Sequence, residues 1–389
     1  MSMKCPGCGG DSHVEMLDVE RVPVYCNVLC NTPEQARAVP RGRLRMLCCE
    51  NCSLVFNAAF NESLLEYSGS YENALHYSPH FRAFADELSR RIVDRFGLRG
   101  AKVADIGCGD GSFLAQVCEL CEGEGLGIDP AHASERSDVG ERVQIVARYF
   151  DKELAGDFPA DLVMSRHVLE HIQAPIEFLS GIREAAGDGT AFYFEVPNGL
   201  WTLDQLGIWD LIYEHCSYFT PPALARLLRS TGFNLDGAVE TMYGGQFLGA
   251  MGQTGVTADG DANAEEIKRI VGAARAFGKQ FSSKLGQWQG DLTRRRARGE
   301  RVAIWGAGSK GVMFLNLMGE AAEAVVCAVD RNPRKQGMHT AGAGVPILAP
   351  SDLKKLDVGT VLVMNPLYQE EVAAELRDLG IDAPVVDAS

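Results

Sequence analysis

The pattern of apolar and polar positions divides the 389 residues into regions of different texture. Between residues 69 and 255, apolar runs typical of buried strands alternate with stretches of helical length. The clearest runs lie at residues 102–106, 125–129, 161–165 and 191–196. Strands separated by helical lengths predict βαβ units and a mostly parallel sheet. We therefore expect an α/β fold with a doubly wound sheet in this region.

A second α/β region is predicted toward the C-terminus. Residues 255–261 are small and polar, as in a linker, and residues 263–297 carry apolar positions at helical spacing. Strand and helix signals resume at residue 301. The pattern predicts an N-terminal region (1–68), an α/β domain (69–255), a linker with a long helix (256–298) and a Rossmann-like α/β domain (299–389).

Composition narrows the range of partners. Lys and Arg number 37 against 52 Asp and Glu, which gives a formal net charge of −15. A field of that sign repels nucleic acid and anionic membranes, so a small-molecule substrate is favoured. No apolar run reaches the ~18 residues that cross a bilayer, and the first residues lack the apolar core of a signal peptide. We expect a cytoplasmic protein.

Seven of the twelve cysteines lie in the first 52 residues. In a reducing compartment, such a cluster favours metal binding over disulfides. Two C-x-x-C turns supply four thiolates for a tetrahedral Zn²⁺ site without an open position, so we expect structural zinc. The expected ligands are Cys5, Cys8, Cys49 and Cys52. Unrelated buried thiols or a redox-active pair are the alternatives, and the nearby Cys26, Cys30 and Cys48 stay unassigned.

The sharpest signal is a glycine-rich loop after the strand at residues 102–106. Asp105 precedes three glycines at alternate positions, Gly107, Gly109 and Gly111, and a helix follows. Glycines let a ligand lie directly on the backbone. The carboxylates of Asp105 and Asp110 would repel a diphosphate, but they suit a cationic ligand such as S-adenosylmethionine (SAM). A tight turn without a ligand is the alternative.

Asp129 ends the next strand, 24 residues after Asp105, where acidic residues bind ribose hydroxyls in nucleoside-binding α/β domains. Together these residues resemble motif I of the class I SAM-dependent methyltransferases. Residues 161–172 resemble the fourth strand of that family with its V-L-E-H continuation. The resemblance implies the doubly wound methyltransferase sheet and a set of cofactor contacts. These are Asp105, Gly107, Cys108, Gly109, Gly111, Asp129, Phe150 and His167.

Residues 213–220 concentrate groups suited to acid–base chemistry. Thr220 and Pro221 have the residue types of a helix start, so the preceding residues lie in a loop where α/β enzymes place catalysis. We expect His215 to act as a general base that Glu214 orients, with Tyr213 as a further catalytic group. The alternative is a loop whose histidine and tyrosines only cap and pack.

Further candidates lie near strand ends and before the first helix of the domain. His171 could polarise a substrate oxygen. We expect substrate contacts from Tyr71, Tyr77, Asn198 and Tyr218. A structural role is the alternative for the first two tyrosines.

A second glycine loop, at residues 306–311, follows a strand and opens a helix, and Asp330 ends the next strand. The spacing G-x-G-x-x-G is a weak dinucleotide signal on its own. Because Lys310 favours a phosphate, we expect Gly308, Lys310 and Asp330 to hold the diphosphate of an activated substrate. A bound NAD and a purely structural half-domain are the alternatives.

The order of these parts resembles the three-domain deoxysugar C-methyltransferases. Residues 305–311, 329–337 and 345–350 carry the C-terminal part of the likeness. That subfamily has a catalytic Y-H-E-H run, of which Glu214 and His215 match the last two positions. Ile212 and Tyr213 stand at the first two.

The resemblance implies methyl transfer from SAM to the carbon beside a ketone of a nucleotide-activated deoxysugar, with structural zinc. O- or N-methylation of another natural-product intermediate is the alternative. An NAD-dependent oxidoreductase that works through the C-terminal loop is a further one.

Overall fold

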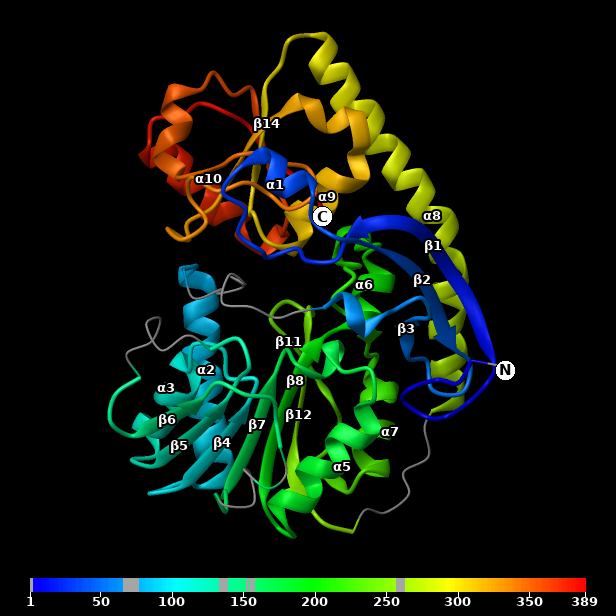
Figure 1. Cartoon of the computed structure of the whole chain (residues 1–389), viewed down its shortest axis with the longest axis vertical. Helices are drawn as coiled ribbons and strands as arrows, with labels where there is room; N and C mark the ends of the chain where they lie inside the picture. The colour runs from blue at the N-terminus through cyan, green and yellow to red at the C-terminus, as the bar shows by residue number, and fades with distance from the viewer. Residues whose placement is uncertain (1–2, 66–76, 133–138, 152, 154–157, 257–262) are drawn as a thin grey trace.

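The described residues of the computed structural model form three β-sheets, near the N-terminus, in the middle and at the C-terminal end (Figure 1). The structure describes residues 3–65, 77–132, 139–151, 153, 158–256 and 263–389. Among these residues, no helix combines the length and the apolar character that a bilayer crossing requires. Tyr71 and residues 257–262 of the expected linker lie outside the described ranges.

The middle sheet has the strand order β10-β12-β8-β7-β4-β5-β6, with β11 paired to β12. Its strands are β4 (Lys102–Ile106), β5 (Glu124–Ile128), β6 (Val143–Val146), β7 (Leu162–Arg166), β8 (Ala191–Pro197), β10 (Phe233–Leu235), β11 (Glu240–Met242) and β12 (Phe247–Thr254). Strands β4 to β8 are parallel, and β12 is antiparallel to β8. The strand order reverses at β4, which has β5 on one side and β7 on the other, and open α/β sheets bind ligands at such a point. The expected α/β doubly wound sheet is confirmed.

Helices cover both faces of this sheet. Helices α2 (Pro79–Phe96) and α3 (Ser112–Leu120) share a core with Val103. Helices α5 (Pro175–Ala186) and α7 (Pro221–Ser230) share the opposite core with Ala104. Neighbouring residues of β4 therefore enter different layers, as in a strand buried on both sides. The short helices η3 (Leu169–His171), α6 (Gly199–Asp204) and η4 (Ile208–Asp210) complete this part.

The N-terminal sheet is antiparallel and has the order β1-β2-β3-β9. Its elements are β1 (His13–Pro23), α1 (Pro33–Arg37), β2 (Arg41–Cys49), β3 (Val55–Asn57), η1 (Glu62–Leu64) and β9 (Ser217–Tyr218). Strand β9 comes from the middle of the chain, directly after His215. The hydroxyls of Ser53 and Thr220 lie 2.7 Å apart beside it. The N-terminal region therefore holds the segment that was expected to carry catalysis.

The C-terminal sheet is parallel and has the order β15-β14-β13-β16-β17. Its strands are β13 (Val302–Trp305), β14 (Val325–Val329), β15 (Ile347–Leu348), β16 (Thr360–Val363) and β17 (Val385–Asp387). Its helices are α9 (Ser309–Met318), η5 (Gly319–Ala324), η6 (Pro350–Lys355), η7 (Pro366–Tyr368) and α10 (Gln369–Asp378).

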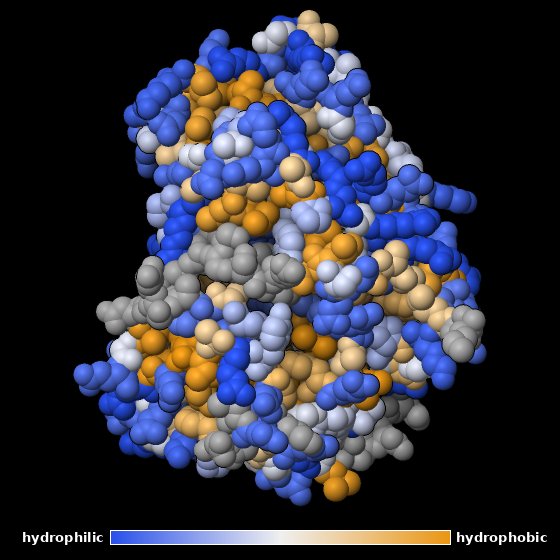
Figure 2. Space-filling view, in the orientation of Figure 1, coloured by the Kyte–Doolittle hydropathy of each residue, from blue (hydrophilic) through white to orange (hydrophobic). Residues whose placement is uncertain are grey.

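Helix α8 (Ala264–Ala297) runs along the side of the molecule and joins the middle of the chain to the C-terminal sheet (Figure 1). Its apolar face, which includes Ile270, Ala274 and Phe277, is buried in a core shared with β1, η4 and α9. Figure 2 shows hydrophilic residues over much of the visible face, with hydrophobic residues in separate patches on its upper and lower parts.

Candidate active site

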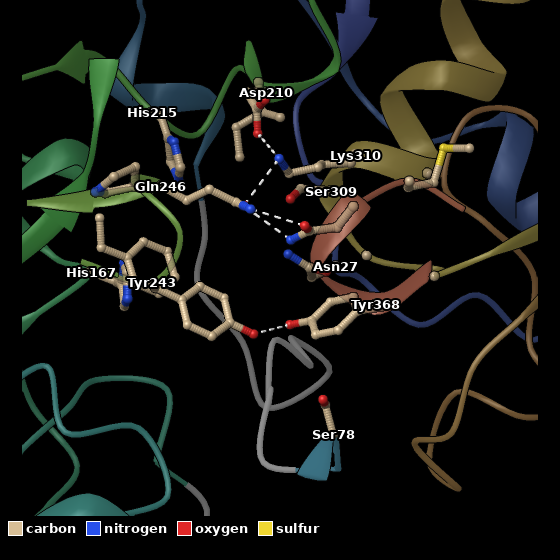
Figure 3. A pocket seen from close by; sticks show the side chains of 18 of the residues that line it. Asn27, Ser78, His167, Asp210, His215, Tyr243, Gln246, Ser309, Lys310 and Tyr368 are labelled. Carbon is tan, nitrogen blue, oxygen red and sulfur yellow. Dashed lines mark hydrogen bonds and ion pairs between the residues drawn. The ribbon is translucent and has the colours of Figure 1, made fainter. Parts of the chain in front are cut away.

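A cavity of about 360 Å³ lies between the middle sheet and the C-terminal glycine loop. The N-terminal region contributes Asn27 to its wall, and the middle sheet contributes His167 and Gln246 (Figure 3). The C-terminal part contributes Lys310 and Tyr368. All three parts of the chain thus meet at one site.

Three histidines on this wall surround one buried carboxylate. His167 follows β7, His171 lies in η3, and His215 precedes β9. The Oε1 atom of Glu170 lies 3.6 Å from Nδ1 of His167 and 4.0 Å from Nε2 of His215. The rings of His171 and His215 are nearly perpendicular, with centroids 4.8 Å apart. The backbone carbonyl of Glu214 lies 2.9 Å from Nδ1 of His171, which places the proton of this ring on Nδ1.

The surroundings of His215 and His167 give these two histidines different protonation states. Burial, helped by His171, lowers the pKa of His215 to about 3, so its imidazole is neutral near pH 7. Burial alone would also lower the pKa of His167, but contacts with Glu170 and Glu195 raise it to about 9. His167 is therefore an imidazolium near pH 7. The site holds a neutral base and a cation side by side.

A buried ion-pair network supports His167 from the sheet. The Oε1 atom of Glu195 lies 2.9 Å from Nε2 of His167, and it accepts hydrogen bonds from Arg166. Tyr193 donates its hydroxyl proton to the other carboxylate oxygen at 2.5 Å. Burial would raise the pKa of Glu195, but Arg166 and His167 hold it at about 2. Residue types in a strand do not reveal such partners, so the role of Glu195 cannot be identified from the sequence.

Two of the expected catalytic side chains point away from the cavity. The carboxylate of Glu214 accepts a hydrogen bond from the backbone N–H of Cys26 at 2.9 Å. The hydroxyl of Tyr213 accepts one from the backbone N–H of Asn61 at 2.8 Å, and its ring stacks on Phe60. A turn at residues 213–214 separates both side chains from His215. Neither side chain lines the cavity, so catalytic roles for Glu214 and Tyr213 stay predictions without a supporting contact, and Glu170 is a carboxylate that faces His215.

The first glycine loop has the geometry expected of a nucleoside-binding turn. Gly107, Gly109 and Gly111 have φ values of +76°, +60° and +78°, which favour glycine. A Cβ atom on Gly107 would lie 2.1 Å from a methyl group of Val168. The carboxylate of Asp129 accepts a hydrogen bond from the N–H of Gly109 at 2.8 Å, so it is fixed against the loop.

Asp105 is buried under this loop, and its Oδ1 atom has no hydrogen-bond partner. Burial raises its pKa to about 7, with a further contribution from Asp129. A buried, unsatisfied carboxyl beside an open backbone cradle fits the cationic part of SAM. Of the other expected cofactor contacts, Cys108 packs against Gly127, Phe150 against Phe178 of α5, and His167 lines the cavity.

The expected substrate residues in the described ranges all line the cavity, although several polar ends are already used. Asn198 accepts from the backbone N–H groups of Leu200 and Trp201 and donates to the carbonyl of Gly245. Tyr218 accepts from the backbone N–H of Ile212 at 2.7 Å. These contacts position the loops around the cavity. Tyr77 also lines it, together with Gly308, Lys310 and Asp330.

Family models match two parts of the chain. Residues 80–237 match a methyltransferase domain, and residues 263–382 match the C-methyltransferase C-terminal domain. The chain is also similar to the C-methyltransferase NovU of Streptomyces niveus, with 24% identity over 373 residues, 89% of this chain and 86% of the relative. The chain is a SAM-dependent methyltransferase, with a methyltransferase domain followed by a C-methyltransferase C-terminal domain.

Two further likenesses cover part of this methyltransferase. A tRNA U34 carboxymethyltransferase of Ectopseudomonas mendocina is 27% identical over 155 residues, 37% of this chain and 48% of that protein. Among solved structures, an O-methyltransferase family protein of Burkholderia thailandensis is 21% identical and covers 46% of this chain and 59% of its own, with a TM-score of 0.35.

The C-terminal glycine loop of the methyltransferase faces the same cavity. The Nζ atom of Lys310 lies 2.7 Å from Oδ1 of Asp210. This ion pair was not predicted from the sequence. The same Nζ atom also lies 4.7 Å from the ring centroid of Trp201. Asp330 accepts a hydrogen bond from the N–H of Ala307 at 3.1 Å, so its carboxylate holds the loop. A phosphate that binds Lys310 must therefore compete with Asp210.

Four cysteines of the N-terminal region form a compact cluster away from the cavity. The Sγ atoms of Cys5 and Cys52 lie 3.6 Å apart, as do those of Cys8 and Cys49. All four Sγ atoms lie within 4.8 Å of one another. Tetrahedral zinc with Zn–S bonds of about 2.3 Å requires sulfur separations of about 3.8 Å. The cluster is thus compatible with zinc.

Proposed function

We propose that this methyltransferase transfers a methyl group from SAM to the carbon beside a ketone of a nucleotide-activated deoxysugar, with His215 as the base. One observation carries the proposal: His215 is a neutral imidazole on the wall of a cavity that also includes the C-terminal glycine loop. A neutral imidazole accepts a proton, and a ketone makes the neighbouring C–H acidic enough to lose one.

The chain's own groups account for the proton and the developing charge. His215 takes the proton from the substrate carbon, and the electron pair of the broken C–H bond delocalises into the ketone to form an enolate. The imidazolium of His167 stabilises the enolate by its positive charge, since its two ring nitrogens already face Glu170 and Glu195. SAM supplies the electrophilic methyl group, so a C–C bond forms as the S–CH₃ bond breaks and S-adenosylhomocysteine is left.

The C-terminal loop provides a handle for the activated substrate. In this proposal Lys310 exchanges Asp210 for the diphosphate, and Gly308 lets the diphosphate approach the backbone near Asp330. The loop and the histidines line the same cavity, as a substrate with both a ketone and a nucleotide tail requires. Binding that tail aligns the ketone with His215, and alignment is a large part of the rate enhancement.

We also propose structural Zn²⁺ at Cys5, Cys8, Cys49 and Cys52, and the division of the chain at residues 68, 255 and 298. The turn with Cys49 and Cys52 joins β2 to β3, and β3 pairs with β9 beside His215. Zinc would therefore support the catalytic segment through the N-terminal sheet rather than through contact with substrate.

The test combines purified protein, SAM with a ¹³C-labelled methyl group and a nucleotide-linked 4-keto deoxysugar. We expect release of S-adenosylhomocysteine and a new carbon-bound methyl signal by NMR. With S-adenosylhomocysteine in place of SAM, we expect exchange of the acidic substrate proton in D₂O, and loss of that exchange in His215→Asn. A product with an oxygen- or nitrogen-bound methyl group, or exchange that survives in His215→Asn, would overturn the proposal.

A further inference from the structure

Glu170 is the most enclosed polar group of the histidine cluster. Only 1% of the residue is exposed, although it lies on the wall of the cavity. Its Oε1 atom is within 4.0 Å of nitrogens of both His167 and His215, and its Oε2 atom has no hydrogen-bond partner. Burial would raise the pKa of this carboxyl, but His167, with His171 and His215, holds it below its usual range. The side chain is thus a carboxylate shared by several imidazoles.

No other carboxylate near His215 in the described chain is available for this contact. Glu214 is directed to the N–H of Cys26. Glu195 is engaged by Arg166, Tyr193 and His167. A buried base that becomes an imidazolium needs a nearby negative charge, since burial penalises the charged form. Glu170 has the position for that task.

We propose that Glu170 is the positioning residue of the methyl-transfer site: its carboxylate lies 4.0 Å from Nε2 of His215 and stabilises the protonated form of that base. The inference rests on the proposed function, in which His215 removes a proton. Through the same carboxylate, Glu170 keeps His167 protonated. One residue thereby sets the protonation of both the base and the neighbouring cation.

The groups that face these two imidazoles come from several elements. His167 faces Glu170 of η3 and Glu195 of β8, and Glu195 is bound in turn by Tyr193 of β8 and Arg166 at the end of β7. His215 faces His171, Glu170 and His167. Replacing Glu170 removes the one negative charge common to both sets. Replacement of Glu170 should therefore change the pKa values of His167 and His215 together.

The same atoms suggest a metal ion as a competing explanation. Ligand atoms of Glu170, His171 and His215 lie within 4.8 Å of one another. Ligands of tetrahedral zinc at about 2.0–2.1 Å are about 3.4 Å apart, and the 4.0 Å between Glu170 and His215 exceeds that separation. The protonated His167 also already supplies a cation to this carboxylate. The geometry favours the positioning role, and a metal is one outcome of the test.

The experiment compares Glu170→Gln with the matched variant Glu214→Gln, and includes Glu170→Asp. The first readout is a pH titration of the histidine side chains by NMR in the free enzyme, which needs no substrate. We expect the pKa of His167 to fall in Glu170→Gln and to stay unchanged in Glu214→Gln. Unchanged histidine titrations in Glu170→Gln, or a shift only in Glu214→Gln, would overturn the proposal.

The second readout is the kinetics of methyl transfer. For Glu170→Gln we expect kcat to fall about 10- to 100-fold with KM nearly unchanged, and Glu170→Asp to recover part of kcat. Wild-type kcat in Glu170→Gln would contradict the proposal. So would a second metal equivalent per chain that Glu170→Gln removes. If the wild type does not turn over the keto sugar, the proposed function fails, but the NMR titration still decides the role of Glu170.

Discussion

Gln246 and Asn365 exchange two hydrogen bonds through their side-chain amides, at 2.9 and 3.0 Å, although they belong to different sheets. Gln246 precedes β12 of the middle sheet, and Asn365 follows β16 of the C-terminal sheet. The hydroxyls of Tyr243 and Tyr368 meet at 2.6 Å in the same region (Figure 3). These contacts hold the two sheets together across the cavity, so substrate groups at this site meet residues whose mutual position is already fixed.

Lys310 and Asp210 provide a test of the substrate handle. If Lys310 binds the diphosphate, Asp210 competes with it, so Asp210→Asn should strengthen substrate binding and Lys310→Ala should weaken it by about tenfold or more. KM values, or calorimetry with the nucleotide diphosphate alone, measure both effects. If the ion pair of Lys310 with Asp210 only stabilises the loop, both substitutions should weaken substrate binding.

Replacement of His215 by Asn should lower kcat by about 10²- to 10⁴-fold, the usual contribution of a general base. SAM affinity should stay unchanged because His215 is not part of the glycine loop. Tyr213→Phe is the matched control: it removes a hydroxyl that accepts from Asn61 outside the cavity. We expect this variant to lose stability but keep kcat; a large loss of kcat would restore Tyr213 as a catalytic residue.

The affinity for SAM should depend on pH through Asp105. Burial raises the pKa of this carboxyl to about 7 in the free protein, so below that pH it is protonated and neutral. Binding of a cation favours the carboxylate and must then release a proton. Calorimetry should therefore show weaker SAM binding as pH falls below 7, with proton release that depends on the buffer. Asp105→Asn should remove the pH dependence along with most of the affinity.

The three glycines of the first loop are not equivalent. Gly107→Ala would set a methyl group 2.1 Å from a methyl of Val168, whereas Gly109→Ala meets nothing within 4 Å. Both have positive φ, which costs alanine about 1–2 kcal/mol. Chemical denaturation should show a larger loss of stability for Gly107→Ala than for Gly109→Ala. Equal losses would mean that Val168 moves away freely.

The cysteine cluster predicts one zinc ion per chain. Cys49→Ser should abolish the metal and lower the thermal midpoint, because a structural ion contributes directly to folding. Cys48→Ala is the matched control, since Cys48 is a buried neighbour outside the cluster. Elemental analysis of both variants shows whether Cys49 or Cys48 is the zinc ligand. Retention of zinc in Cys49→Ser together with its loss in Cys48→Ala would shift the ligand assignment by one residue.

Local features of the sequence predicted the middle of the fold well. The run Val103–Ile106 lies within β4, and the glycine loop leads into α3. The helical period at residues 263–297 corresponds to α8. Side-chain periodicity and glycine conformation act over a few residues, so the sequence carries them directly. The pairing of β3 with β9 joins segments about 160 residues apart in the chain, and no local pattern announces it.

The sequence by itself determined which functional groups the protein contains: a glycine loop for SAM, four clustered thiols, and a histidine segment before a helix. Only the tertiary structure decided which carboxylate serves His215. Glu214 is its neighbour in sequence, but a turn directs that side chain to Cys26. Glu170 reaches His215 from another loop, because β7 and β9 bring their ends to one cavity. The sequence states which residues are neighbours along the chain. Catalysis depends on the direction of the side chains and on the distances between their atoms, and folding sets both.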